Sequence, residues 1–205
     1  MVPLLKIHPV NPHKRLISQA AEVVREGGVI AYPTDTAYGL GCTLSNRRGV
    51  ERIIHIKQLP ANHNFSILCP DLAEIARYAR VDNATYRILK RFLPGPYTFV
   101  LEATRDVPKN ILPRRKTIGL RIPGHPICLA LLQAVGEPLL SSSIRLPQEQ
   151  HVLNDPEEIH QRLSGQVELV IDGGILLSDP STVVDLTGPT PVVLRSGAGD
   201  PTVFM

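Results

Sequence analysis

The sequence is poor in the residues that mark several classes of protein. It has no tryptophan, two methionines and three cysteines among 205 residues, and aromatic residues make up 4% of the chain. Cys42, Cys69 and Cys128 are isolated, with neither Cys-x-x-Cys nor Cys/His metal spacing. This pattern is typical of reduced thiols rather than of a disulfide framework or a zinc site. We therefore expect no dedicated metal site.

Long apolar runs, a leader-like start and a linker are also lacking. No stretch reaches the length of a membrane span, and residues 1–11 lack the apolar core of a signal peptide. The composition, 43% hydrophobic and 20% charged, is ordinary for a globular protein. We expect a cytoplasmic protein with no membrane partner, organised as a single domain over residues 1–205.

Charge is modest overall but uneven along the chain. The net charge is +3, yet residues 87–121 hold nine Lys/Arg against two acidic residues, whereas residues 145–185 hold two against eight. This asymmetry favours a basic face that meets nucleic acid or nucleotide. The alternative is a solvated surface on which the charges cancel. Arg114, Arg115 and Lys116 form the strongest local cluster and are our candidate RNA-binding residues.

Hydrophobic periodicity predicts helices interleaved with strands. The predicted helices cover 14–26, 48–57, 72–79, 82–92, 126–135 and 155–163, and the predicted strands cover 29–32, 65–69, 97–103, 117–122, 138–142, 167–171, 182–186 and 191–195. Strands and helices do not alternate strictly, as they would in a chain built only of βαβ units. This order indicates an α/β fold, a twisted mixed sheet with packed helices.

The segment from Val29 to Cys42 has the layout of a ligand site. A β-type run ends at Pro33, two threonines and an aspartate follow, and then comes Gly39-Leu40-Gly41. Hydroxyls and backbone N–H groups can hold an anionic ligand, with Lys57 as the counter-charge. The Gly-x-Gly alone also fits a plain turn after a buried strand. The chain has no Gly-x-x-x-x-Gly-Lys-(Ser/Thr) motif, so a phosphate site here is not of the P-loop kind.

Five blocks resemble the YrdC family in the family's own order. Residues 33–41 fit Pro-Thr-(Asp/Glu)-Thr-x-Tyr-Gly-Leu-Gly, 117–123 the Gly-x-Arg-x-Pro strand, 138–143 the serine-rich loop, 181–185 Ser-Thr-Val-x-Asp, and 194–197 the terminal Arg-x-Gly. The blocks span essentially the entire chain. The resemblance implies a YrdC-like α/β sheet with a concave basic cleft.

The resemblance also implies an activity and its partners. Members of the family use ATP, L-threonine and bicarbonate to make threonylcarbamoyl-adenylate, the donor for a tRNA adenosine modification. We therefore expect L-threonine, bicarbonate, ATP or AMP, and tRNA or other structured RNA as partners, with Mg²⁺ entering only together with ATP. Positioning and neutralisation of phosphate charge would carry most of the rate.

Roles transfer from the family to individual residues of this chain. The resemblance assigns substrate binding to Thr34, Thr36, Arg121, Ser142 and Ser181, nucleotide binding to Lys57, Thr117, Ser143, Arg145 and Arg195, and catalytic roles to Lys57 and Arg121. The guanidinium fork of Arg121 is an independent reason to expect a carboxylate there. The plainer interpretations are a surface ion pair for Arg121 and turn or capping roles for the serines.

Three departures resemble the YciO branch of the family. The family's Lys-x-Arg-Pro reads Lys57-Gln58-Leu59-Pro60, its Ser-x-Asn ends in Arg145, and Leu68 stands where a histidine is expected. Loss of a phosphate-binding arginine typically costs on the order of a hundredfold in rate. Arg145 could restore that charge from the other side of the cleft. His63 is either structural or a new ligand contact.

Three hypotheses follow from these observations. The first is a threonylcarbamoyladenylate synthase-like enzyme. The second is a paralogue that binds double-stranded RNA, tRNA or rRNA and has weak or no synthase activity, which Leu59 and the cluster of Arg114, Arg115 and Lys116 favour. The third is a generic ligand-binding α/β domain.

Overall fold

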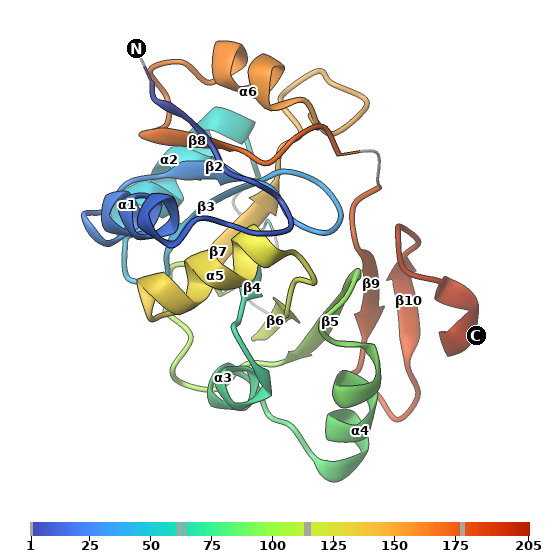
Figure 1. The fold of residues 1–205 in the computed structure, drawn as a ribbon. Helices are drawn as coiled ribbons and strands as arrows, with labels where there is room; N and C mark the ends of the chain where they lie inside the picture. The colour runs from blue at the N-terminus through green and yellow to red at the C-terminus, as the bar shows by residue number, and fades with distance from the viewer. Residues whose placement is uncertain (1, 61–62, 64, 113–115, 177–178) are drawn as a thin grey trace.

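The computed structural model describes residues 2–60, 63, 65–112, 116–176 and 179–205. Its ten strands form one mixed sheet in the order β1-β8-β2-β3-β7-β4-β6-β5-β9-β10 (Figure 1). The strands are β1 (Leu4–Lys6), β2 (Ile30–Tyr32), β3 (Gly39–Thr43), β4 (Ser66–Leu68), β5 (Tyr97–Glu102), β6 (Thr117–Arg121), β7 (Leu139–Ser143), β8 (Leu169–Asp172), β9 (Thr182–Asp185) and β10 (Val192–Arg195). The predicted mixed α/β sheet is therefore confirmed.

Helices cover both faces of this sheet. They are α1 (Lys14–Arg25), α2 (Arg47–Lys57), α3 (Leu72–Tyr78), α4 (Asn83–Phe92), α5 (Pro126–Val135), α6 (Pro156–Arg162) and the 3₁₀ turn η1 (Pro201–Phe204). Helices α1 and α5 pack together over one apolar cluster, whereas α2, α3, α4 and α6 contribute to a second (Figure 1). The residues of β2 alternate between the two clusters, because successive side chains of a strand point to opposite faces.

Local capping explains why the predicted helices begin where they do. The side chains of Asp71, Asp82 and Asp155 accept hydrogen bonds from backbone N–H groups in the first turns of α3, α4 and α6. Gly136 ends α5 with a left-handed φ of 81°, a conformation that glycine adopts without steric cost. The predicted bounds of α5 match the structure, and those of the other helices differ by one residue at one or both ends.

The Gly39-Leu40-Gly41 segment corrects a prediction, because it is strand β3 and not a turn or loop. It pairs antiparallel with β2 on one side and with β7 on the other. A Cβ atom on Gly41 would lie 2.7 Å from Cε1 of Tyr32 and 2.8 Å from the carbonyl oxygen of Leu140. Glycine at position 41 therefore leaves room for the ring of Tyr32, whose hydroxyl donates to Ser141 Oγ at 2.8 Å, whereas Gly39 lines the cavity described below.

Two further findings concern strands. The strand predicted over 138–142 is confirmed as β7, which carries the serine-rich block and pairs with β3 and β4 in the middle of the sheet. Strand β1, which was not predicted, pairs in parallel with the distant β8. None of the helices in the described ranges is long and apolar enough to cross a membrane.

Candidate functional site

A cavity of about 140 Å³ lies where the ends of several strands meet. Its lining includes eight of the residues assigned from the sequence, namely Thr34, Thr36, Lys57, Arg121, Ser142, Ser143, Ser181 and Arg195. They come from the segment after β2, the last residue of α2, the ends of β6, β7 and β10, and the residue before β9. The fold thus gathers at one place side chains that are far apart in the sequence.

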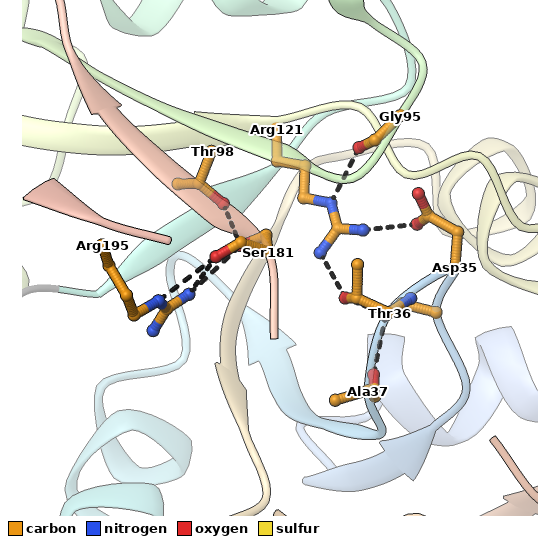
Figure 2. Close-up of polar contacts among 9 residues, drawn as sticks. Asp35, Thr36, Ala37, Gly95, Thr98, Arg121, Ser181 and Arg195 are labelled. Carbon is orange, nitrogen blue, oxygen red and sulfur yellow. Dashed lines mark hydrogen bonds and ion pairs between the residues drawn. The ribbon is translucent and has the colours of Figure 1, made fainter. Parts of the chain in front are cut away.

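Arg121 is the most strongly held cation of this cavity. Its side chain is 6% exposed, and its Nη2 atom lies 2.5 Å from Asp35 Oδ1. Nη1 donates to Thr36 Oγ1 at 2.8 Å, and Nε donates to the carbonyl oxygen of Gly95 at 3.3 Å. Figure 2 shows the guanidinium between these three partners. Burial lowers the pKa of Arg121, which Asp35 partly opposes, but an arginine stays charged at neutral pH.

The threonine segment before β3 is shaped by its own hydroxyls. Thr34 Oγ1 donates to the carbonyl oxygen of Ala37 at 2.7 Å and accepts from the backbone N–H of Thr36 at 3.2 Å. Both threonine side chains are buried, and their Oγ1 atoms are 3.1 Å apart. Thr34 therefore shapes the turn, and the turn places the Thr36 hydroxyl against Arg121.

Lys57 enters the cavity from the end of α2 on the opposite side. The residue is 9% exposed, and its Nζ donates to Ser142 Oγ and, at 2.6 Å, to the carbonyl oxygen of Ser143. Burial, together with the positive charges of Arg145 and Arg195, lowers the pKa of Lys57 to about 8. An anion bound here would favour the charged amine.

His63 lies beside Lys57 in the cavity wall. Its ring meets the Phe65 ring edge-on, with the centroids 5.0 Å apart. Burial, followed by the charge of Lys57, lowers the pKa of His63 to about 4. The imidazole is therefore neutral at pH 7 and can act as a hydrogen-bond acceptor or donor there.

Ser181 and Arg195 form the far wall of the cavity. Ser181 Oγ lies 2.8 Å from Thr98 Oγ1, and Arg195 donates to the carbonyl oxygen of Ser181 from Nη2 at 2.6 Å and from Nε at 3.2 Å (Figure 2). A Cβ atom on Gly197 would lie 2.1 Å from the carbonyl oxygen of Pro180. Only glycine permits this approach, which fixes the strand-end segments that carry both side chains.

The cavity is electropositive. Lys57, Arg121 and Arg195 line it, and among the described residues Asp35 is the carboxylate that contacts one of these cations. The described residues contain no group of three or more His, Cys, Asp or Glu side chains placed to hold a metal ion. The arrangement suits an anionic ligand, whose negative charge these cations would neutralise.

The three residues that depart from the family pattern lie in different parts of the structure. Leu68 lines the cavity and is paired in register with Arg121. Leu59 packs against the apolar cluster next to α2, and its N–H bonds the carbonyl oxygen of Ile54, so it is not among the described lining residues. Arg145 is exposed and outside the lining, yet its charge acts on Lys57.

Thr117 and the predicted RNA-binding residues lie elsewhere. Thr117 begins β6 at the end opposite to Arg121, about 13 Å away at the 3.3 Å rise of a strand residue, and it lines a separate hollow with Lys116 and Glu102. The structure therefore does not bring Thr117 to the cavity. Lys116 is exposed, with a φ of 56°. Arg114 and Arg115 lie outside the described residues.

Sequence reasoning missed three members of the site. Asp35 pairs with Arg121, Thr98 bonds Ser181, and Ser66 also lines the cavity. Asp35 could have been found, because it stands inside the motif and a buried arginine requires an acidic partner. Thr98 and Ser66 lie in predicted strands, where a single hydroxyl carries no signal of its own.

The chain is similar to proteins of a known family in both sequence and structure. A family model named for Sua5, YciO and YrdC and described as "Telomere recombination" matches residues 22–197. The uncharacterised protein YciO of Escherichia coli K12 is 52% identical over 200 residues, which cover 97% of each chain. The crystal structure of E. coli YciO aligns over the whole of both chains with a TM-score of 0.96 and 51% identity.

More distant relatives have a named activity or ligand. A threonylcarbamoyl-AMP synthase of Chromobacterium violaceum is 34% identical over 180 residues, covering 87% of this chain and 92% of its own. A crystal structure of Pyrococcus abyssi Sua5 complexed with L-threonine aligns with a TM-score of 0.89 and 30% identity. That alignment covers 96% of this chain and 58% of the Sua5 chain.

Proposed function

The chain belongs to the Sua5/YciO/YrdC family, and we propose that it is an ATP-dependent enzyme that makes L-threonylcarbamoyladenylate or a related carbamoyl adenylate. The observation that carries this proposal is the convergence of Arg121, Lys57 and Arg195 on one cavity. The substrates would be threonine, bicarbonate and ATP, and the product would feed a tRNA modification. The threonylcarbamoyl-AMP synthase among the relatives supports the choice of reaction.

Arg121 would bind the amino acid. Of its five N–H groups, three are used by Asp35, Thr36 and Gly95, so two are left for a carboxylate. The threonine-bound relative supports an amino acid as the ligand. The Asp35 carboxylate, which neutralises Arg121 while no ligand is bound, lies where it would attract the substrate's ammonium group.

The cations on the other side would neutralise the phosphates. The ammonium group of threonine first loses a proton to solvent, and the neutral amine then attacks bicarbonate and gives a carbamate with loss of water. A carbamate oxygen then attacks the α-phosphorus of ATP, the bond to the bridging oxygen breaks, and pyrophosphate leaves with Mg²⁺. Lys57 and Arg195 would reduce the charge repulsion in this step, and no serine nucleophile is needed.

Substrate turnover tests the proposal directly. Purified protein is incubated with ATP, labelled bicarbonate and each amino acid in turn, and pyrophosphate and labelled adenylate are measured. We expect threonine-dependent release, lowered at least tenfold by Arg121→Lys because an ammonium cannot grip a carboxylate bidentately. The exposed Arg47→Lys is the matched control. No product with any amino acid, together with no calorimetric signal for ATP or AMP, would contradict the proposal.

A second candidate is binding of structured RNA with weak or no synthase activity. Leu59 packs on the apolar cluster where a phosphate-binding arginine is expected. The basic side chains of residues 87–121 that are exposed on α4 and the loops around β5 are Arg87, Lys90, Arg91, Arg105, Lys109 and Lys116. Arg121 is not part of that face, because it is buried and ion-paired.

A further inference from the structure

Lys57 and Ser142 form a buried pair for which the proposed synthase has no covalent use. Lys57 Nζ and Ser142 Oγ are in direct hydrogen-bond contact, both residues are less than 10% exposed, and both line the cavity. When the amine is protonated, Nζ donates to the serine oxygen. When the amine is neutral, the same contact carries the serine hydroxyl proton toward the lysine nitrogen, which is the geometry of an activated nucleophile.

The surroundings of Lys57 favour the neutral amine. Burial and the charges of Arg145 and Arg195 lower its pKa to about 8, and the neighbouring His63 is uncharged at pH 7. No carboxylate is among the causes of the pKa shift of Lys57. About a tenth of the lysine is therefore neutral at pH 7 and about half at pH 8, and a base with a pKa near the working pH is the most effective one.

Ser142 is distinguished from its two neighbours by its partner. Ser141 accepts a hydrogen bond from Tyr32, which is not a base at neutral pH because burial raises its pKa. Ser143 is bonded by Lys57 through its backbone carbonyl. From this geometry we propose that Ser142 is a nucleophile activated by Lys57, and that the protein transfers or hydrolyses acyl groups of small anionic esters or acyl phosphates.

Acyl transfer to Ser142 and hydrolysis of the acyl-serine need no co-reactant other than water. Ser142 Oγ attacks the carbonyl carbon while its proton moves to Lys57 Nζ, and the Oγ–C bond forms. The bond from carbon to the leaving group then breaks, and Lys57 returns the proton to the departing oxygen. Water attacks the acyl-serine by the same route, which releases the acid and restores the Ser142 hydroxyl.

The charge of the cavity defines the substrate class. Arg121 keeps two N–H groups for a carboxylate or phosphate, and Arg195 brings positive charge close enough to shift Lys57. The same charge would stabilise the oxyanion that forms after attack. With a volume of about 140 Å³, the cavity suits a small acyl compound that carries a negative group.

Covalent labelling tests this inference. The intact protein is treated with a small fluorophosphonate, the labelled peptide is mapped by mass spectrometry, and the release of nitrophenolate from mono-4-nitrophenyl glutarate is compared with that from 4-nitrophenyl acetate. We expect the label on Ser142, faster reaction with the anionic ester, and a rate that rises with pH through about 8. Ser142→Ala abolishes the label.

Lys57→Arg tests whether Lys57 acts as a base or only as a positive charge. Arginine keeps the charge but has no neutral form at these pH values, so we expect the labelling rate to fall about a hundredfold or more and to lose its rise near pH 8. A label on another residue, no label on the folded wild-type protein, or an unchanged rate in Lys57→Arg would overturn the inference.

Labelling in the presence and absence of ATP distinguishes the Ser142 nucleophile from the proposed synthase activity. The inference goes beyond the synthase and does not depend on it, since labelling requires no nucleotide. ATP that protects Ser142 from the label would place the nucleotide in this cavity. Labelling that ATP does not affect would leave the nucleophile intact and count against the nucleotide site.

Discussion

Arg121 and Asp35 form an ion pair of 2.5 Å in which the arginine side chain is 6% exposed and the aspartate side chain 16%. The pair joins the end of β6 to the segment after β2, so it holds together two parts of the cavity wall. The pair also neutralises the charge of the guanidinium while no ligand is bound. A carboxylate that binds Arg121 has to share it with Asp35.

Removing Asp35 should cost stability. Asp35→Ala leaves a buried guanidinium without its counter-charge, and breaking one side of such a pair typically costs about 3–5 kcal/mol. Asp35→Asn keeps an oxygen for Nη2 and should cost less. Urea unfolding measures both, and Glu51→Ala, which breaks the exposed ion pair of Glu51 with Arg47, should cost about 0–1 kcal/mol. Equal losses for Asp35→Ala and Glu51→Ala would contradict a buried role for the pair.

Lys57 should make stability rise with pH in the alkaline range. Its pKa in the folded protein is about 8, against 10.5 for an ordinary lysine, so between these values the unfolded chain binds more protons than the folded one. The unfolding free energy contributed by Lys57 therefore increases from pH 8 to pH 10.5, by roughly 3 kcal/mol at 1.36 kcal/mol per unit. Lys57→Met should remove this increase, as seen by comparing urea midpoints of both proteins at pH 7, 8, 9 and 10. Parallel pH profiles would show that Lys57 is not perturbed.

Restoring the family residues should raise synthase activity. In the double variant Leu59→Arg/Arg145→Asn, the family's arginine returns two residues after Lys57, in place of a leucine that packs on the apolar cluster, and the exposed Arg145 is removed. We expect threonine-dependent pyrophosphate release to increase by at least tenfold, since one clamp residue is worth about two orders of magnitude. A correctly folded double variant with no gain would mean that the cavity serves another reaction.

The basic segment should bind RNA in a salt-dependent way. Replacing Arg114, Arg115 and Lys116 with glutamate should weaken binding to tRNA more than tenfold. The dependence of log affinity on log salt should become less steep by about 0.7 to 0.9 for each lost phosphate contact. Gel shifts over a salt series measure this, while calorimetry with ATP should be unchanged because Lys57 lines the cavity and Lys116 lines a separate hollow. Wild-type protein that shifts neither tRNA nor duplex RNA at low salt would exclude RNA binding.

Much of the fold could be predicted because its signals are local. The caps at Asp71, Asp82 and Asp155 mark helix starts through N–H groups that lie only two or three residues further along the chain. Strand β3 was not predicted, because its two glycines are typical of a turn. The segment is a strand because β2 and β7 pair with it on both sides, and the Tyr32 ring fills the space that a Cβ atom at Gly41 would need. No local pattern reveals these contacts.

The candidate site was predictable to the extent that the family motifs are continuous in sequence. Residues of those motifs such as Thr36, Lys57 and Arg121 do meet in one cavity. Thr117 lies in the same motif block as Arg121 but at the other end of the strand, because a block in sequence covers the full length of β6. The motif offers Asp35 as a candidate acidic partner, but its pairing with Arg121 depends on how two distant strand ends converge, which sequence spacing does not encode.

The far wall of the cavity is made of segments that are synthesised after the rest of its lining. A nascent chain that has emerged through β7 already carries Lys57, Arg121 and Ser142, but it lacks Ser181 and Arg195, and also Gly197, which packs against the Pro180 carbonyl. Such a chain lacks one wall of the cavity, so the complete anion site can form only after β10 has been made.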